Sequence, residues 1–237
     1  MNAIAPEPPL SATFAASALS FRVGCLDEAA DLVRCHHYSR RFGGNIQVVG
    51  TWHEPGGLFG DYGRAVAACV FARPGARWDE PVFELVRLVR VPELRTSLTG
   101  LIAATARHLK VKGGDLLVSY ADPTAGHHGG IYQAASWKYA GRRAKRIDGL
   151  VVGGIFVPGR TCNTRWGTRS PVGVSGKLPH LTVEPHFDLG KHLYWRPLTK
   201  AGGAKAERLG LLSLPYPKPD HAEARMAAKF AEPEYDA

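Results

Sequence analysis

The most informative segment of the chain is Leu116-Leu117-Val118-Ser119-Tyr120-Ala121-Asp122, followed by Gly126-His127-His128-Gly129-Gly130-Ile131-Tyr132. Its apolar first half predicts a buried strand over residues 116–121, and the glycine-rich turn leads into a helix over about residues 130–139. Hydroxyl, carboxylate and imidazole groups therefore gather where a strand ends. A loop held there by rigid elements commonly carries a functional site.

Strand-like and helical patterns alternate on both sides of this stretch. Apolar residues recur at helical spacing over residues 26–37 and 98–109. The ranges predicted as strands are 46–52, 65–71, 82–91, 116–121, 150–157 and 192–198. A turn-rich link over 54–60 predicts that the first two of these strands form a hairpin. In the strand over 82–91, regular alternation places Glu84 and Arg87 on opposite faces.

The interleaved order of elements predicts a single α/β (α+β) domain built on one mixed sheet over residues 21–215. Residues 1–20 are rich in Pro, Ala and Ser, which predicts a disordered N-terminal extension. Residues 158–188 are rich in Gly, Pro and basic side chains and are expected to form a basic irregular insert. Residues 216–237 are polar and are expected to form a loose tail.

The chain is strongly basic, with 30 Lys and Arg against 21 Asp and Glu and a formal charge of +9. Such an excess favours a polyanionic partner, which is a nucleic acid, an acidic surface or a phosphate-bearing cofactor; general solubility is the alternative. Basic residues cluster close in sequence to the reactive stretch, and this favours nucleic acid.

Several classes of protein are disfavoured. No run of about 18 apolar residues occurs, so no membrane-spanning helix is predicted. The first residues lack the basic and apolar regions of a secretion signal, so the cytoplasm is the expected location. The four cysteines are widely spaced without a CxxC pair, which predicts free thiols rather than disulfides or a zinc site. Adjacent histidines at 127 and 128 are poorly placed to chelate one ion, so no metal is expected.

The order helix, hairpin, strand, helix, strand, helix, strand resembles the fold of the GCN5-related N-acyltransferases. The resemblance implies that the helix after the fourth strand binds the pyrophosphate of an acyl-CoA, with acetyl-CoA as the expected form, on its N-terminal amides. The corresponding loop supplies the expected cofactor-binding residues, which are Arg95, Ser97, Leu98, Thr99 and Gly100. Leu98 stands where the family pattern has a glycine, and a side chain there is expected to hinder a phosphate. An ordinary capped helix start is the alternative.

Three segments resemble the Mom family of phage-encoded DNA-modification proteins. They are Cys35-His36-His37-Tyr38-Ser39, Glu84-Leu85-Val86-Arg87-Leu88, and the Ser119–Asp122 block with its Gly-His-x-Gly-x-Ile-Tyr-Gln-Ala continuation. The resemblance extends over about residues 36–194. It implies that adenine in DNA is converted to N6-carbamoylmethyladenine, which protects phage DNA from restriction in the host cell cytoplasm. The implied partner is double-stranded DNA, from which the adenine is flipped into the site.

The same resemblance selects five catalytic candidates: His37, Tyr38, Ser119, Asp122 and Tyr132. His37 could transfer a proton at neutral pH, or it could be a packed residue that continues the stripe of its helix. Asp122 could orient or deprotonate the adenine amine, or it could only initiate the turn before Pro123. Tyr132 is the candidate for protonating a departing thiolate, and an aromatic residue packed on the sheet is the alternative.

The expected DNA-binding residues are basic side chains and one tryptophan: Arg40, Arg41, Arg142, Arg143, Lys145, Arg146, Arg165, Trp166 and Arg169. Arg and Lys neutralise phosphates, and Trp166 could stack on or wedge beside a base. A solvated basic turn is the alternative. Two other functions remain open at this point, an acyl-CoA-dependent N-acyltransferase acting on a protein or small-molecule amine and a non-catalytic DNA-binding module.

Overall fold

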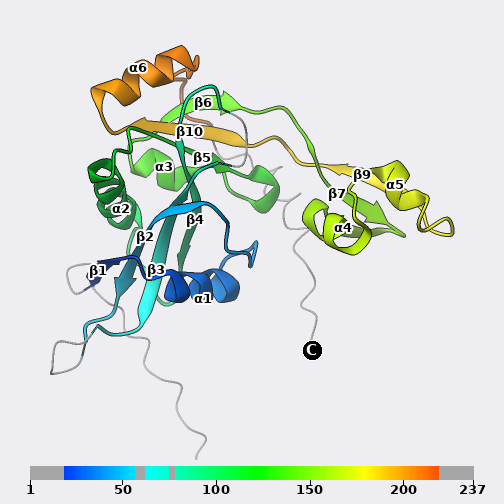
Figure 1. The fold of residues 1–237 in the computed structure, drawn as a ribbon, viewed down its shortest axis with the longest axis horizontal. Helices are drawn as coiled ribbons and strands as arrows, with labels where there is room; N and C mark the ends of the chain where they lie inside the picture. The colour runs from blue at the N-terminus through cyan, green and yellow to red at the C-terminus, as the bar shows by residue number, and fades with distance from the viewer. Residues whose placement is uncertain (1–18, 57–61, 75–77, 219–237) are drawn as a thin grey trace, which may run out of the picture. The chain divides into compact units, whose positions relative to one another are not determined.

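The computed structural model describes residues 19–56, 62–74 and 78–218 (Figure 1). The strands are β1 (Ser20–Val23), β2 (Ile46–His53), β3 (Ala65–Ala72), β4 (Phe83–Arg90), β5 (Leu116–Ala121), β6 (Lys138–Arg142), β7 (Ile147–Val152), β8 (Ile155–Pro158), β9 (Val183–Phe187) and β10 (His192–Pro197). The helices are α1 (Leu26–His36), α2 (Thr99–Val111), α3 (Gly130–Ala134), α4 (Gly159–Trp166), α5 (Pro171–Ser175) and α6 (Lys200–Arg208), with a 3-10 turn over Pro123–Ala125.

The strands form two sheets. The larger has seven strands in the order β1-β2-β3-β4-β5-β10-β6, and the smaller has three in the order β8-β7-β9. Strands β1 to β4 pair antiparallel, as the predicted hairpin of β2 and β3 requires, whereas β4 and β5 pair parallel around the α2 crossover. The mixed α/β architecture on a mixed sheet is therefore confirmed.

Contacts divide the described residues into two compact units. Unit 1 contains the residues up to Ser119 together with 131–138 and 195–211. Unit 2 contains residues 120–130, 139–194 and those from Leu212 onward. Among the described residues, no helix combines the length and the apolar character needed to cross a bilayer.

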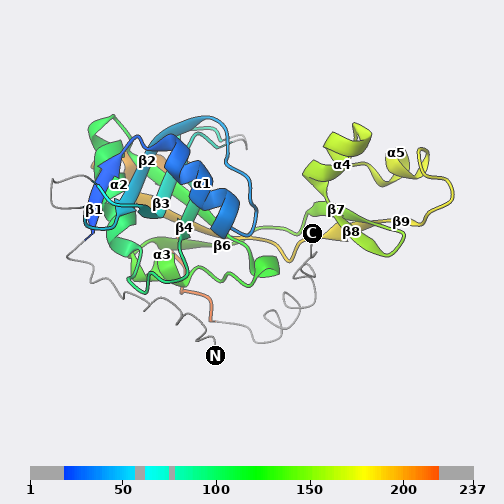
Figure 2. The same ribbon diagram turned by 90° about the horizontal axis from the view of Figure 1, so that it is seen from below.

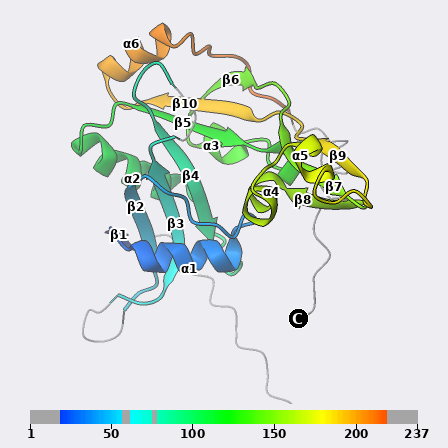
Figure 3. The ribbon, with the colours of Figure 1, turned by 45° about the vertical axis from the view of Figure 1, so that its right-hand side comes forward.

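Helices α1 and α2 cover opposite faces of the β2–β3 region in unit 1. Helix α1 buries Ala29, Leu32 and Val33 and packs on β3 and β4 (Figure 3). Helix α2 packs on β2 so closely that a Cβ at Gly50 would collide with Thr105. Glycine is therefore required at position 50 by the close approach of the helix.

A β-bulge overturns the expected orientation of Glu84 and Arg87. In the β3–β4 ladder, Arg87 lies opposite Val70 but Leu85, not Val86, lies opposite the next β3 residue, so Val86 is an extra residue in β4. Opposite residues share a face, and Glu84 and Arg87 lie opposite Ala72 and Val70, which are two apart in β3. The two side chains consequently lie on the same face, because a bulge shifts the alternation by one residue.

Two further predictions are corrected in the C-terminal half of the chain. The strand expected over 150–157 is a hairpin of β7 and β8, because Gly153 and Gly154 have φ angles of 57° and 85° and form a tight turn. The helix expected over 130–139 ends at Ala134, and β6 starts at Lys138. Ser136 has a φ of 59°, a left-handed conformation that stops the helix.

The segment expected to be an irregular insert is mostly ordered. Residues 158–188 contain α4, α5 and β9, and they pack against β7 and β8 in unit 2 (Figure 2). Its small core consists of Leu150, Val152, Val157, Cys162 and Val174. Pro171 and a Ser170 side chain that accepts the Gly173 amide start α5, a helix signal hidden among turn-forming residues.

The chain ends differ from the expectation where they are described. Strand β1 begins at Ser20, inside the predicted N-terminal extension, while residues 1–18 lie outside the described residues. Helix α6 was not predicted, since Gly202 and Gly203 weaken its pattern; Gly202 is needed because a Cβ there would meet the Asp115 backbone. Most of the predicted tail, and residues 57–61 of the predicted turn, also lie outside the described residues.

Candidate active site

Ser119 and Tyr132, two of the predicted site residues, form a hydrogen-bonded pair in unit 1. The last paired residues of β4 and β5 are Glu84 and Val118. One residue further on, the Ser119 hydroxyl oxygen lies 2.8 Å from the Leu85 carbonyl oxygen and 2.8 Å from the Tyr132 hydroxyl oxygen. Both side chains are buried.

This pair can serve both protonation states of Tyr132. A serine hydroxyl carries one proton and can also accept hydrogen bonds. When Ser119 donates to the Leu85 carbonyl, its oxygen can accept the proton of Tyr132. When Tyr132 has lost its proton, Ser119 can turn and donate to the phenolate instead. The phenolate that forms on proton loss therefore still has a hydrogen-bond donor, Ser119.

The surroundings of Tyr132 keep its hydroxyl protonated. Burial raises the pKa of Tyr132 well above the ordinary value of 10.0, and this effect outweighs the Ser119 hydrogen bond, which lowers it. Electrostatic interaction with Tyr38, Cys69 and Glu84 raises the pKa of Tyr132 in the same direction as burial. At neutral pH the tyrosine is consequently a proton donor rather than a base.

Two contacts with Trp137 hold Tyr132 in place, and a third holds the end of its helix. Its ring lies 5.4 Å from that of Trp137, between ring centroids, and its carbonyl accepts the Trp137 amide at 2.9 Å. The guanidinium of Arg196 on β10 donates to the Ala135 carbonyl at 3.0 Å, at the end of α3. These hydrogen bonds therefore hold the C-terminal end of α3.

His37 and Tyr38 follow α1 and stack on each other, with ring centroids 4.4 Å apart. The Ser39 amide donates to His37 Nδ1 at 3.1 Å, so the neutral imidazole carries its proton on Nε2. Tyr38 is 63% exposed, whereas His37 is half-buried. Of the two, Tyr38 also acts electrostatically on Tyr132.

Arg87 anchors the segment that carries these two residues. Its Nε donates to the Arg41 carbonyl at 2.6 Å, and its Nη1 donates to the Val86 carbonyl at 2.5 Å. Arg87 follows the extra residue of the β4 bulge, Val86. Sequence reasoning missed this role, since nothing in a single sequence marks the bulge. Arg40 has a φ of 47° and its amide donates to the His37 carbonyl, so it forms part of the same turn.

Asp122 lies in unit 2, where both of its carboxylate oxygens have partners. Oδ1 accepts the Thr124 amide at 3.0 Å and caps the 3-10 turn, and Oδ2 pairs with Lys191 Nζ at 2.9 Å. Asp122 thus initiates the turn before Pro123, which was the alternative to a catalytic role. Burial lowers the pKa of the nearby His127. The negative charge of Asp122 raises that pKa and so opposes the effect of burial, whereas His128 lowers it further.

The loop before α2 has the features of an anion site in unit 1. Leu98 occupies the N-cap position without a side-chain capping bond, and the first turn of α2 has no acidic residue. Leu98 is buried, and the expectation that its side chain hinders a phosphate stays a prediction. Arg95 and Ser97 are exposed. Packing explains the glycine at position 100, because a Cβ there would lie 3.2 Å from the ring of Trp52.

The basic residues expected to contact DNA are mostly in unit 2, where they are exposed. Residues 139–194 contain nine Lys and Arg against three Asp and Glu. The exposed basic side chains of this stretch are Arg142, Arg143, Lys145, Arg146, Arg160, Arg165, Arg169 and Lys177. Trp166 is different: it packs partly against the small core, and the Arg165 guanidinium lies 5.7 Å from its ring centroid. The Trp166 side chain is therefore not free to insert between DNA bases. Arg40 and Arg41 are exposed in unit 1.

The chain belongs to the Mom protein family, whose family model matches residues 20–218. No curated protein matches the chain.

Three similar solved structures are acetyltransferases. A Bacillus subtilis acetyltransferase in complex with CoA has 13% identity and a TM-score of 0.43, and the match covers 76% of this chain and 99% of that one. The Arabidopsis thaliana NAA60 in complex with a bisubstrate analogue has 12% identity, a TM-score of 0.43 and coverage of 76% and 99%. The Escherichia coli ribosomal-protein-S18-alanine N-acetyltransferase has 10% identity, a TM-score of 0.41 and coverage of 76% and 95%.

Proposed function

We propose that the protein is a transferase that converts adenine in DNA to N6-carbamoylmethyladenine and thereby protects phage DNA from restriction. The observation that carries the proposal is the buried Ser119–Tyr132 pair, in a chain that belongs to the Mom protein family. A positioned proton donor accelerates group transfer to an amine where a leaving group becomes negatively charged.

In this proposal Tyr132 Oη gives a proton to a developing negative charge, and Ser119 turns to stabilise the phenolate. The raised pKa keeps the proton in place before the reaction. Tyr38, which is exposed and stacked on His37, contacts the incoming base. Asp122 is assigned a positioning role through Lys191 and the capped turn.

The residues at the start of α2 fit an acyl-CoA. Its pyrophosphate would be held by the amides of Thr99 and Gly100, with Arg95 and Ser97 as exposed polar neighbours. When bound, this cofactor would supply an acyl group activated as a thioester, and transfer of that group alone to N6 would give an amide. The carbamoylmethyl group is joined to N6 through a methylene carbon, so its formation would need a donor other than simple acyl transfer from the thioester. The Thr99 amide donates to Ser97 Oγ at 3.4 Å, a bond that a phosphate would replace, and the absence of acidic residues in the first turn of α2 favours an anion.

Double-stranded DNA is the proposed partner, bound through the exposed basic side chains of residues 139–194. Phosphate neutralisation gives affinity that falls steeply with salt and does not depend on sequence. The N6 amine is engaged in base pairing inside a duplex, so the adenine has to leave the stack before it reacts.

Mass spectrometry of nucleosides tests the acceptor directly. Plasmid DNA from cells that express the wild-type chain should contain a deoxyadenosine of increased mass, whereas DNA from cells with the Tyr132→Phe variant should not. Salt-dependent DNA binding without any modified nucleoside would instead support a binding module. Labelling of protein or small-molecule amines by acyl-CoA, with unmodified DNA, would support the amine acyltransferase. Either result overturns the proposal.

A further inference from the structure

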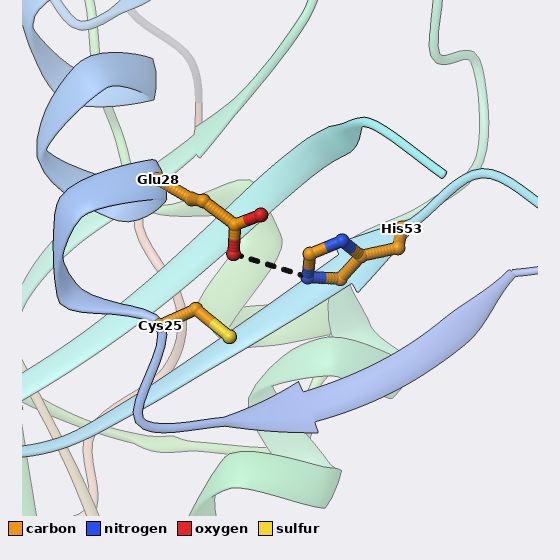
Figure 4. A group of neighbouring side chains, drawn as sticks. All are labelled: Cys25, Glu28 and His53. Carbon is orange, nitrogen blue, oxygen red and sulfur yellow. Dashed lines mark ion pairs between the residues drawn. The ribbon is translucent and has the colours of Figure 1, made fainter. Parts of the chain in front are cut away.

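Three side chains with metal-binding atoms meet at the start of α1 in unit 1, and none of them belongs to the candidate active site. Cys25 precedes the helix, Glu28 lies in its first turn and His53 is the last residue of β2. Their ligand atoms all lie within 4.8 Å of one another (Figure 4). We propose that Cys25, Glu28 and His53 bind one divalent transition metal ion of the zinc type, which ties α1 to β2.

The orientation of His53 favours metal binding. The residue is fully buried, and its Nδ1 lies 3.0 Å from the Gly63 carbonyl oxygen. A carbonyl can only accept, so Nδ1 carries the proton and Nε2 presents a lone pair. Nε2 lies 3.6 Å from a Glu28 carboxylate oxygen (Figure 4). Metal-ligating histidines characteristically donate their other N–H to a carbonyl or carboxylate, which fixes the ring.

The chemistry of the three donors selects the ion. Thiolate, imidazole and carboxylate together suit zinc and its neighbours, whereas calcium and magnesium prefer oxygen ligands alone. Cys25 occupies the N-cap of α1, but its side chain makes no capping bond, so the sulfur is not used by the helix. The N-terminus of a helix also favours negatively charged ligands.

Other groups around His53 Nε2 compete with a metal ion for its lone pair. The Thr51 hydroxyl oxygen lies 2.9 Å from Nε2, and Arg22 lies 4.0 Å from the Glu28 carboxylate. Without a metal, the Thr51 hydroxyl donates to Nε2, or a protonated His53 pairs with Glu28. The hydroxyl of Thr51 can rotate away and leave the lone pair to an ion. Removing this competitor should therefore strengthen metal binding rather than weaken it.

The proposed role is to anchor α1. Three protein ligands leave one tetrahedral position for water. Helix α1 has 11 residues and is about 16 Å long, so the site lies at the end opposite Tyr38. A metal there fixes the helix that precedes the His37–Tyr38 pair, without contact with the reacting groups. The spacing of the cysteines does not reveal the site, because its ligands come from a helix start, a helix turn and a strand end.

Metal binding to the purified full-length protein tests the proposal. After treatment with a chelator, the protein should bind one equivalent of Zn²⁺ in competition with a chromophoric chelator. Co²⁺ should give a thiolate-to-metal charge-transfer band. The Cys25→Ser variant should lose this band and weaken Zn²⁺ binding by at least about 100-fold, and Glu28→Gln should weaken it by at least about 10-fold.

Matched variants separate the site from the rest of the chain. Cys35→Ser, on the exposed part of α1, and Asp27→Asn, in the first turn, should leave the band and the affinity unchanged. Thr51→Val should bind Zn²⁺ at least as tightly as the wild type. Circular dichroism of each variant checks that it is folded. Absence of stoichiometric Zn²⁺ binding, or binding that survives Cys25→Ser intact, overturns the proposal.

Discussion

Removal of the Ser119 hydroxyl and removal of the Tyr132 hydroxyl should have different consequences. Ser119→Ala deletes two hydrogen bonds, one with the Leu85 carbonyl and one with Tyr132. At about 1 kcal/mol for each bond, the variant should lose about 2 kcal/mol of unfolding free energy. Tyr132→Phe deletes one of these two bonds and keeps the packed ring, so the loss of the bond to Ser119 should cost about 1 kcal/mol.

The effects on activity should be ranked in the opposite order. Tyr132→Phe removes the proton donor and should lower the modification rate by about 100-fold or more. Ser119→Ala keeps the donor and should retain more activity. Tyr139→Phe is a matched control, because Tyr139 is also buried and its hydroxyl lies 2.8 Å from His192 Nδ1.

Urea unfolding at neutral pH and mass spectrometry of modified deoxyadenosine measure these two properties. In thermal unfolding, a loss of 1 kcal/mol lowers Tm by about 2–4 °C in a protein of this size. If Tyr132→Phe destabilises the protein more than Ser119→Ala, the Ser119 hydroxyl does not bridge the two partners. If Ser119→Ala is the less active variant, Tyr132 is not the proton donor.

Three further predictions follow from other parts of the structure. Burial raises the pKa of Cys69 from 9.0 to about 12. The free energy of unfolding that the protonated thiol contributes is therefore present below pH 9 and is lost as the pH rises toward 12. In unfolding experiments across this range, the Cys69→Ala variant should lose less unfolding free energy with rising pH than the wild type. Lys145→Gln should reduce the slope of log K against log salt for DNA binding by about 1, whereas Lys110→Gln on α2 should not change it. Gly129→Ala should destabilise the protein more than Gly154→Ala in denaturant titrations, because both have positive φ but only Gly129 has an aromatic ring where a Cβ would be.

Much of unit 1 could be predicted from the sequence because its patterns are local. The buried strand at 116–121 was located correctly, and so was the helix that starts at Leu26. The pairing of Ser119 with Tyr132 is not local. It depends on how a short helix returns to the strand, which no periodicity encodes, and only the Mom resemblance placed both residues in one site.

The failures have physical causes. A bulge of one residue reversed the expected faces of Glu84 and Arg87, because alternation holds only while the ladder is regular. Residues 158–188 were expected to be irregular since glycine and proline are frequent there, yet Ser170 and Pro171 use this chemistry to begin a helix. Cys25, Glu28 and His53 were not connected, because their proximity is produced by tertiary packing.

In the proposed function, Tyr132 donates the proton in a reaction that modifies adenine. The most direct measurement is the fraction of modified deoxyadenosine in DNA from cells that express equal folded amounts of wild type, Tyr132→Phe or Tyr139→Phe. We predict a modified nucleoside with wild type and Tyr139→Phe, and at most about one hundredth of that amount with Tyr132→Phe. Equal modification by wild type and Tyr132→Phe would contradict the claim.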